Sequence, residues 1–124
     1  MIGRHCLKIW SSTQKNITLS SAEAELVAAV KMSTELIGML QLAADWNITM
    51  PGRVLVDSTA ALGVVKRHGN GRLRHIRVGM HWVQQKQEAG ELAHRKVPGQ
   101  DNPGDLMTKH LADAVISRHM SAFA

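Results

Sequence analysis

Three acidic residues, each in a separate short segment, could together hold divalent metal ions. They are Glu25 in SSAEAEL, Asp57 in RVLVDSTAAL and Asp105 in PGQDNPGDLMTK. Hard cations such as Mg²⁺ take oxygen ligands, and two ions roughly 4 Å apart can activate water and stabilise the leaving oxygen of a phosphodiester. That chemistry needs carboxylates from several elements and no cysteine, serine or histidine nucleophile. We therefore predict that Glu25, Asp57 and Asp105 bind metal and act in catalysis.

Each of these carboxylates also has a structural interpretation. Glu25 alone would be interpreted as a surface acid, because an unpaired glutamate is almost never buried. Asp57 follows an apolar segment and could cap the next helix, a role that Ser58 could also fill. Asp105 falls in the first turn of an expected helix, where the helix dipole favours an acid. The combination of the three residues, rather than any one of them, favours a metal site.

The apolar periodicity predicts the elements that must position these acids. A long helix is expected over 21–46, after a capping box that begins at Ser20. Further helices are expected over 58–67, 74–89 and 103–120, and strands over 4–10, 53–57 and 91–97. The continuous apolar run at 54–56 predicts that its strand is buried on both faces of the sheet. This order of elements is typical of an α/β domain with at least partly parallel strands.

Length and composition limit the class of protein. The 124 residues predict a single domain over 1–124, with an aliphatic core because the chain has one Phe, three Trp and no Tyr. The single cysteine, Cys6, excludes an internal disulfide and argues against a zinc cluster. It indicates a reducing compartment, so we expect an intracellular protein, cytoplasmic or nuclear. No run of about 18 apolar residues occurs, so we expect no membrane span.

The positive charge is concentrated in one part of the chain. The formal net charge is +5, and the segment 66–96 alone carries eight basic and two acidic residues. A localised basic field favours a polyanionic partner, and the alternative is a solvated helix face. Arginine suits phosphate recognition, and polar side chains can add contacts to a nucleic-acid backbone. The residues that we predict to contact nucleic acid are Ser12, Thr13, Gln14, Lys15, Arg72, Arg74, His75 and Arg77.

Four segments resemble, in the same order, the ribonuclease H (RNase H) domain of copia-type LTR retrotransposon polyproteins. They are KIWSSTQKNITLSSAEAEL, VLVDSTAAL, GRLRHIRVGMHWVQQKQEAGEL and KVPGQDNPGDLMTKHL, and they cover most of residues 8–111. The resemblance implies an RNase H-like α/β fold, a mixed sheet flanked by helices. It also implies endonucleolytic hydrolysis of the RNA strand of RNA–DNA hybrids, with two Mg²⁺ ions in the complete site or Mn²⁺ in their place. The second, third and fourth carboxylates of the family fall on Glu25, Asp57 and Asp105.

The chain departs from the family pattern at its N-terminus. The first carboxylate of the family lies on an opening strand, whereas no Asp or Glu precedes Glu23 here. We therefore expect a domain that is incomplete at its N-terminus and lacks the first strand and most of the second. Another segment, a partner strand or a second copy of the chain would then complete the sheet.

The resemblance implies several partners and leaves other functions open. The implied partners are an RNA–DNA hybrid or other duplex nucleic acid, and the reverse transcriptase domain of the same polyprotein. Besides the nuclease, the sequence is compatible with a non-catalytic nucleic-acid-binding module and with an inactive retroelement remnant. The loop before the last acid, VPGQDN, contains no histidine; His94 lies earlier, in an expected strand, and we assign it no catalytic role.

Overall fold

The computed structural model describes residues 1–3, 5–12, 14, 20–66, 78–107, 109–121 and 123. The chain forms two compact units, one of residues Thr18–Lys96 and the other of Met1–Ile17 together with Val97–Ala124. The single domain over 1–124 stays a prediction.

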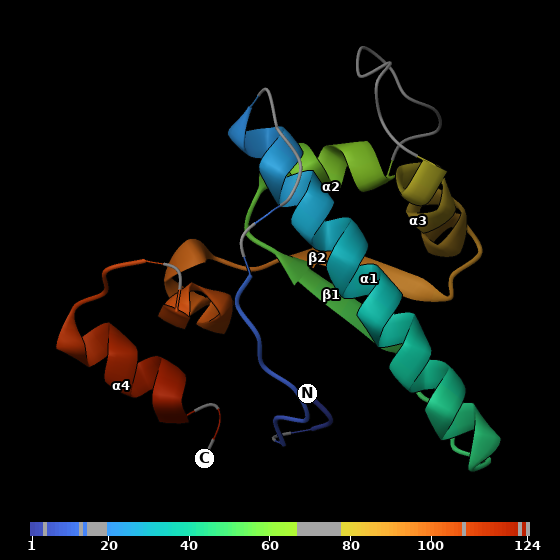
Figure 1. Ribbon diagram of the computed structural model, residues 1–124, viewed down its shortest axis with the longest axis horizontal. Helices are drawn as coiled ribbons and strands as arrows, with labels where there is room; N and C mark the ends of the chain where they lie inside the picture. The colour runs from blue at the N-terminus through green and yellow to red at the C-terminus, as the bar shows by residue number, and fades with distance from the viewer. Residues whose placement is uncertain are drawn as a thin grey trace. The chain divides into compact units, whose positions relative to one another are not determined.

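A two-stranded parallel sheet is the centre of the Thr18–Lys96 unit. Strand β1 (Gly52–Val56) pairs with β2 (Leu92–Lys96), in a register that places Gly52 opposite Leu92 and Val56 opposite Lys96. Helices α1 (Ser21–Asp45), α2 (Thr59–Lys66) and α3 (Val78–Glu88) pack against this sheet (Figure 1). The predicted α/β architecture with parallel strands is confirmed. The sheet of the described residues is parallel throughout, and the mixed sheet of an RNase H-like fold stays a prediction.

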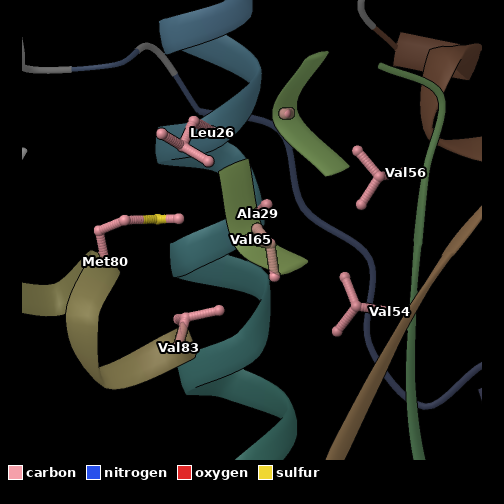
Figure 2. Close-up of a cluster of buried hydrophobic side chains, with 8 residues drawn as sticks. Leu26, Ala29, Val54, Val56, Val65, Met80 and Val83 are labelled. Carbon is pink, nitrogen blue, oxygen red and sulfur yellow. The ribbon is translucent and has the colours of Figure 1, made fainter. Parts of the chain in front are cut away.

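The core lies between the sheet and the three helices. Its buried members come from all three helices and from β1, and seven of them are labelled in Figure 2. Full burial of one such side chain is worth roughly 1.5–3 kcal/mol, so this cluster holds the unit together. As the composition predicts, the cluster is aliphatic: Leu26, Ala29, Val54, Val56, Ala61, Val65, Met80 and Val83.

Strand β1 is buried on one face only, so the prediction of burial on both faces was wrong. Val54 and Val56 are buried, whereas Leu55 between them is 57% exposed. Successive side chains of a strand point to opposite faces, and the core helices contact the face that carries Val54 and Val56. An apolar run does not reveal which of its members are covered, because covering depends on the elements that pack against each face.

The ends of two helices follow from local sequence. The Ser20 hydroxyl accepts a hydrogen bond from the Glu23 N–H at 3.2 Å, so the predicted cap of α1 is confirmed. Helix α3 ends at Glu88, and Gly90, two residues later, has a φ of +75° that suits glycine. The N–H groups of Gly90 and Glu91 donate to the carbonyls of Gln87 and Lys86, at 3.2 and 3.1 Å. These two bonds form a Schellman motif, which satisfies the last carbonyls of the helix.

Helix α1 is long and apolar enough, by length and composition, to cross a membrane. The same properties suit a helix that packs in a protein core. Leu26, Ala29 and Ser33 of α1 are buried in the unit, and Leu26 and Ala29 belong to its core cluster. The absence of a membrane span stays a prediction.

Gly52 at the start of β1 is closely surrounded by leucine side chains. A Cβ atom at this position would lie 2.8 Å from Cδ1 of Leu40 and 2.8 Å from Cδ2 of Leu92. We expect Gly52→Ala to lower the free energy of unfolding by about 1 kcal/mol, because both methyl groups must move to admit the new atom. Gly63→Ala is the matched control, since a Cβ atom there meets nothing within 4 Å. Urea denaturation of both variants checks this, and equal stability of the two would contradict it.

The second unit contains no long strand among its described residues. The predicted strand over 4–10 is absent from residues 5–10, and Ile2 and His5 form only an isolated antiparallel bridge. An alternating segment becomes a strand only when a neighbouring strand accepts its hydrogen bonds, which the local pattern does not reveal.

The predicted helix over 103–120 is two separate elements. A 3₁₀-helix, η2 (Pro103–Met107), follows a shorter one, η1 (Gly99–Asp101), and an α-helix, α4 (Asp113–Ser121), comes later. Pro103 begins η2, as its fixed φ favours. Helix α4 begins at Asp113, and the carbonyl of the preceding Ala112 accepts from the N–H groups of Val115 and Ile116 at 2.9 and 3.0 Å. Residues 109–112 contain no glycine or proline, so the local sequence gives no signal for this interruption.

Candidate functional site

Asp57 lies at the carboxyl end of β1, where the strand turns into α2. Its neighbour Ser58 caps α2: the Ser58 hydroxyl accepts from the Ala61 N–H at 3.2 Å, and the Ser58 carbonyl accepts from the Leu62 N–H at 3.1 Å. The structural role that the sequence offers to Asp57 is therefore filled by Ser58. Asp57 itself is half-buried, directly beyond the last strand residue.

Lys96 ties the carboxyl ends of the two strands together. It is the last residue of β2 and lies opposite Val56 in the sheet. Its Nζ donates to the main-chain carbonyl of Asp57 at 2.9 Å and to Oγ1 of Thr59 at 2.5 Å. In open α/β sheets, ligands bind outside the carboxyl ends of parallel strands. The turn that carries Asp57 occupies that position in this unit.

Glu25 lies at the same end of the unit as Asp57. Helix α1 runs antiparallel to β1, so its first turns lie where β1 ends (Figure 1). Leu40 contacts the start of β1 at Gly52, whereas Leu26 shares the core cluster with residues of β1. A helix rises about 1.5 Å per residue and a strand about 3.3 Å. The helical segment from Leu40 back to Glu25 and the extended segment from Gly52 to Asp57 therefore each cover roughly 20 Å. Glu25 is exposed at this end.

Asp105 belongs to the other unit, in η2. Its carboxylate forms an ion pair with Nζ of Lys109 at 3.0 Å, and its side chain is 13% exposed. Glu25 and Asp57 thus lie at one end of the Thr18–Lys96 unit, and Asp105 belongs to the other unit. Within either unit, the described residues contain no group of three or more histidine, cysteine or acidic side chains that could hold a metal ion. The three-carboxylate metal site stays a prediction.

The residues predicted to contact nucleic acid are only partly described. Ser12 and Gln14 lie in the N-terminal segment, and both are exposed. The others fall outside the described residues, and their roles stay predictions: Thr13, Lys15, Arg72, Arg74, His75 and Arg77.

A buried polar network that sequence reasoning missed joins α1, α3 and β2. His94 is 1% exposed and Ser33 is fully buried. Nε2 of His94 lies 2.9 Å from Oγ of Ser33, and Nδ1 lies 2.7 Å from Oε1 of Gln87. The main-chain N–H of His94 donates to the same Oε1 at 2.8 Å. That atom is therefore the amide oxygen, and Nδ1 of His94 must carry a proton to donate to it.

The proton positions in this network follow from counting donors. Oγ of Ser33 also lies 2.7 Å from the Ala29 carbonyl, and the hydroxyl has one proton to give. With neutral His94, that proton goes either to Nε2 or to Ala29. With charged His94, Nε2 donates to Ser33, and Ser33 donates to Ala29. Burial lowers the pKa of His94 below its usual 6.5, and the nearby charge of Lys66 lowers it further, so the neutral form is favoured.

The interacting residues of this network are far apart in sequence. Ser33 and His94 are 61 positions apart, so no local motif joins them. One sequence signal could have indicated that His94 is buried. It lies two positions after Leu92 in the expected strand, so the two side chains point to the same face, and Leu92 is equally buried. Ser33 and His94 are buried and Gln87 is half-buried, so this network links the three elements from within the unit.

Comparison with known proteins identifies the chain as similar to part of a retroelement polyprotein. Its relatives are retrovirus-related Pol polyproteins from plant copia-type transposons. It is 30% identical over 101 residues, 80% of the chain, to the Pol polyprotein of transposon TNT 1-94 from Nicotiana tabacum. It is 26% identical over 114 residues, 90% of the chain, to those of transposons RE1 and RE2 from Arabidopsis thaliana.

These relatives are far longer than the matched region. The chain spans 8% of the length of each of these polyproteins. No family model matches the chain, and no solved structure does. The similarity therefore supports a retrotransposon-derived region, and its activity is a matter for proposal.

Proposed function

We propose that this chain is the RNase H-like region of a retroelement Pol polyprotein, which binds RNA–DNA hybrids and, in its complete form, hydrolyses their RNA strand. The observation that carries the proposal is the position of Asp57 at the carboxyl end of β1, at the same end of the unit as Glu25. Similarity to Pol polyproteins over most of the chain supports the retroelement origin.

Glu25, Asp57 and Asp105 would hold two Mg²⁺ ions, for which Mn²⁺ could substitute. The donors fit these ions, because carboxylate oxygens are the ligands that hard cations prefer. Bound ions would supply activation of water and stabilisation of the leaving oxygen. The chain's own contribution is to fix the acids: β1 and the Ser58 cap set the position of Asp57, and α1 sets that of Glu25.

The partners follow from the same proposal. An RNA–DNA hybrid, or another duplex, would bind through the basic segment 66–96 and through Ser12 and its neighbours. A reverse transcriptase domain of the same polyprotein would be the covalent neighbour. A partner strand or a second copy of the chain would complete the sheet. The site of action would be intracellular, in the cytoplasm or the nucleus.

Cleavage of a labelled RNA–DNA hybrid by the complete form, in the presence of Mg²⁺, tests the proposal. We expect Asp57→Asn to reduce cleavage by more than the roughly 10–100-fold that loss of an outer-shell partner causes, because a direct ligand is lost. Hybrid binding should persist. Asp45→Asn is the matched control, since it makes the same charge change at an exposed residue at the end of α1. Equal cleavage by the two variants would refute the assigned role of Asp57.

The basic segment supports a second candidate, a non-catalytic module that binds duplex nucleic acid. Such a module would bind the hybrid with an affinity that falls with salt and would not cut it. An inactive remnant would neither bind nor cut at low salt. The same assay therefore distinguishes all three functions.

A further inference from the structure

We propose that Lys96 contacts a backbone phosphate of the bound nucleic acid, next to the Asp57 carboxylate. This inference rests on the proposed function and singles out one lysine of the basic segment 66–96 that is not among the predicted nucleic-acid contacts. The exposed lysine ends β2 at the carboxyl edge of the sheet, where α/β proteins bind ligands.

The two groups that accept hydrogen bonds from Lys96 do not neutralise its positive charge. Its ammonium group donates to the Asp57 carbonyl and to the Thr59 hydroxyl, which are both uncharged. An ammonium has three N–H donors, and these two contacts use two of them. One donor is therefore available for an anion, and neither acceptor neutralises the positive charge.

The two described bonds also fix where that charge lies. A lysine side chain is long and has many rotamers, and an unrestrained one loses much entropy when it binds a ligand. Here the Asp57 carbonyl and Thr59 hydroxyl hold the ammonium beside the turn that follows β1, at 2.9 and 2.5 Å. A phosphate would meet a cation that is already in place.

Helix stability does not explain a cation at this position. Thr59 is the first residue of α2, and the positive end of a helix dipole lies at its N-terminus. The dipole disfavours Lys96 there, whereas a phosphate oxygen would be attracted by it. Ser58 already caps the helix, so Lys96 is not needed as a cap.

The chemistry of the ammonium identifies the kind of ligand. A lysine is a point charge that binds phosphate without reading bases, so its contribution should be the same for every sequence. A phosphate bound to Lys96 would lie next to the residue that we propose as a metal ligand. Lys96 would thereby position the backbone at the proposed site of cleavage.

Hybrid binding measured by fluorescence anisotropy over a salt series, with EDTA present to prevent cutting, tests this inference. We expect Lys96→Met to reduce the slope of log affinity against log salt by about one and to weaken binding equally for hybrids of different sequence. Lys31→Met is the matched control: it removes the same charge from an exposed lysine of α1, outside the basic segment 66–96. The control should keep the wild-type slope.

Further variants separate charge from folding. Lys96→Arg should restore the slope, because it keeps the positive charge, and thermal unfolding should show that Lys96→Met is folded. Equal slopes for Lys96→Met and Lys31→Met would overturn the inference while the proposed function stands. Absence of hybrid binding by the wild-type chain would overturn both. Binding without cleavage would refute the proposed nuclease activity and would leave the proposed role of Lys96 unchanged.

Discussion

Replacement of Leu92 by alanine is expected to lower the free energy of unfolding by about 2–5 kcal/mol, the usual cost of truncating a buried leucine. Leu92 begins β2 and is 1% exposed. Its Cδ2 lies 2.8 Å from the position of a Cβ atom at Gly52, so the side chain fills the space that the glycine leaves. Alanine would remove that contact and leave a cavity between the strands and α1.

Leu55 provides the matched control, because it is a leucine of the partner strand that is 57% exposed. Leu55→Ala should change stability by about 0.5 kcal/mol or less, as surface substitutions usually do. Urea denaturation of both variants measures the difference. Similar losses for the two leucines would show that both faces of the sheet are covered in solution, and would contradict the one-sided burial of β1.

The second large effect concerns His94 and pH. Because burial holds the pKa of His94 below 6.5 in the folded protein, the unfolded chain binds more protons in the range just below that value. Stability from this residue is therefore present above pH 6.5 and is lost as the pH falls toward the folded pKa. A difference of one pKa unit between folded and unfolded protein corresponds to about 1.4 kcal/mol.

Gln87→Glu is expected to remove or reverse this loss of stability at acid pH. The new carboxylate would replace Oε1, which lies 2.7 Å from Nδ1, and would accept the same two hydrogen bonds. A negative charge at that distance favours the imidazolium and raises the pKa of His94. The charged form then donates to Ser33, and Ser33 donates to the Ala29 carbonyl at 2.7 Å, so every proton has an acceptor.

Urea denaturation between pH 5 and 8, with a nuclear magnetic resonance titration of the His94 ring, measures both quantities. Gln85→Glu is the matched control, since it adds the same charge at an exposed position of α3. The control should keep the wild-type dependence on pH. A Gln87→Glu protein whose stability still falls in acid as the wild type does would refute the proton arrangement assigned to Ser33, His94 and Gln87.

The helices that follow from short-range signals were predicted well. The Ser20 cap, the helix from Ser21 and its end near Asp45 depend on hydrogen bonds and periodicity within a few residues. The strand before Asp57 and its helix were predicted for the same reason, with bounds that differ by one or two residues. Local backbone chemistry decides such features, so the sequence around them is sufficient evidence.

The candidate site was predictable only in part. The order of Glu25, Asp57 and Asp105 is a property of the sequence, and so is the position of Asp57 after a strand. The shared location of Glu25 and Asp57 depends on the antiparallel course of α1 over β1, a tertiary feature. The cap at Ser58 and the reach of Lys96 to the Asp57 carbonyl also became visible only in the folded chain.

The sequence by itself determined the order of helices and strands between Ser21 and Lys96, the aliphatic core and the concentration of charge between Lys66 and Lys96, because these depend on composition and nearest neighbours. The tertiary structure decided which face of β1 is covered, that residues 5–10 form no strand, and that His94 meets Ser33 of α1 and Gln87 of α3. The physical reason is that burial and hydrogen-bond partners are supplied by residues far away in the chain. A strand needs a neighbour and a buried polar group needs an acceptor, and no local pattern states where either will be found.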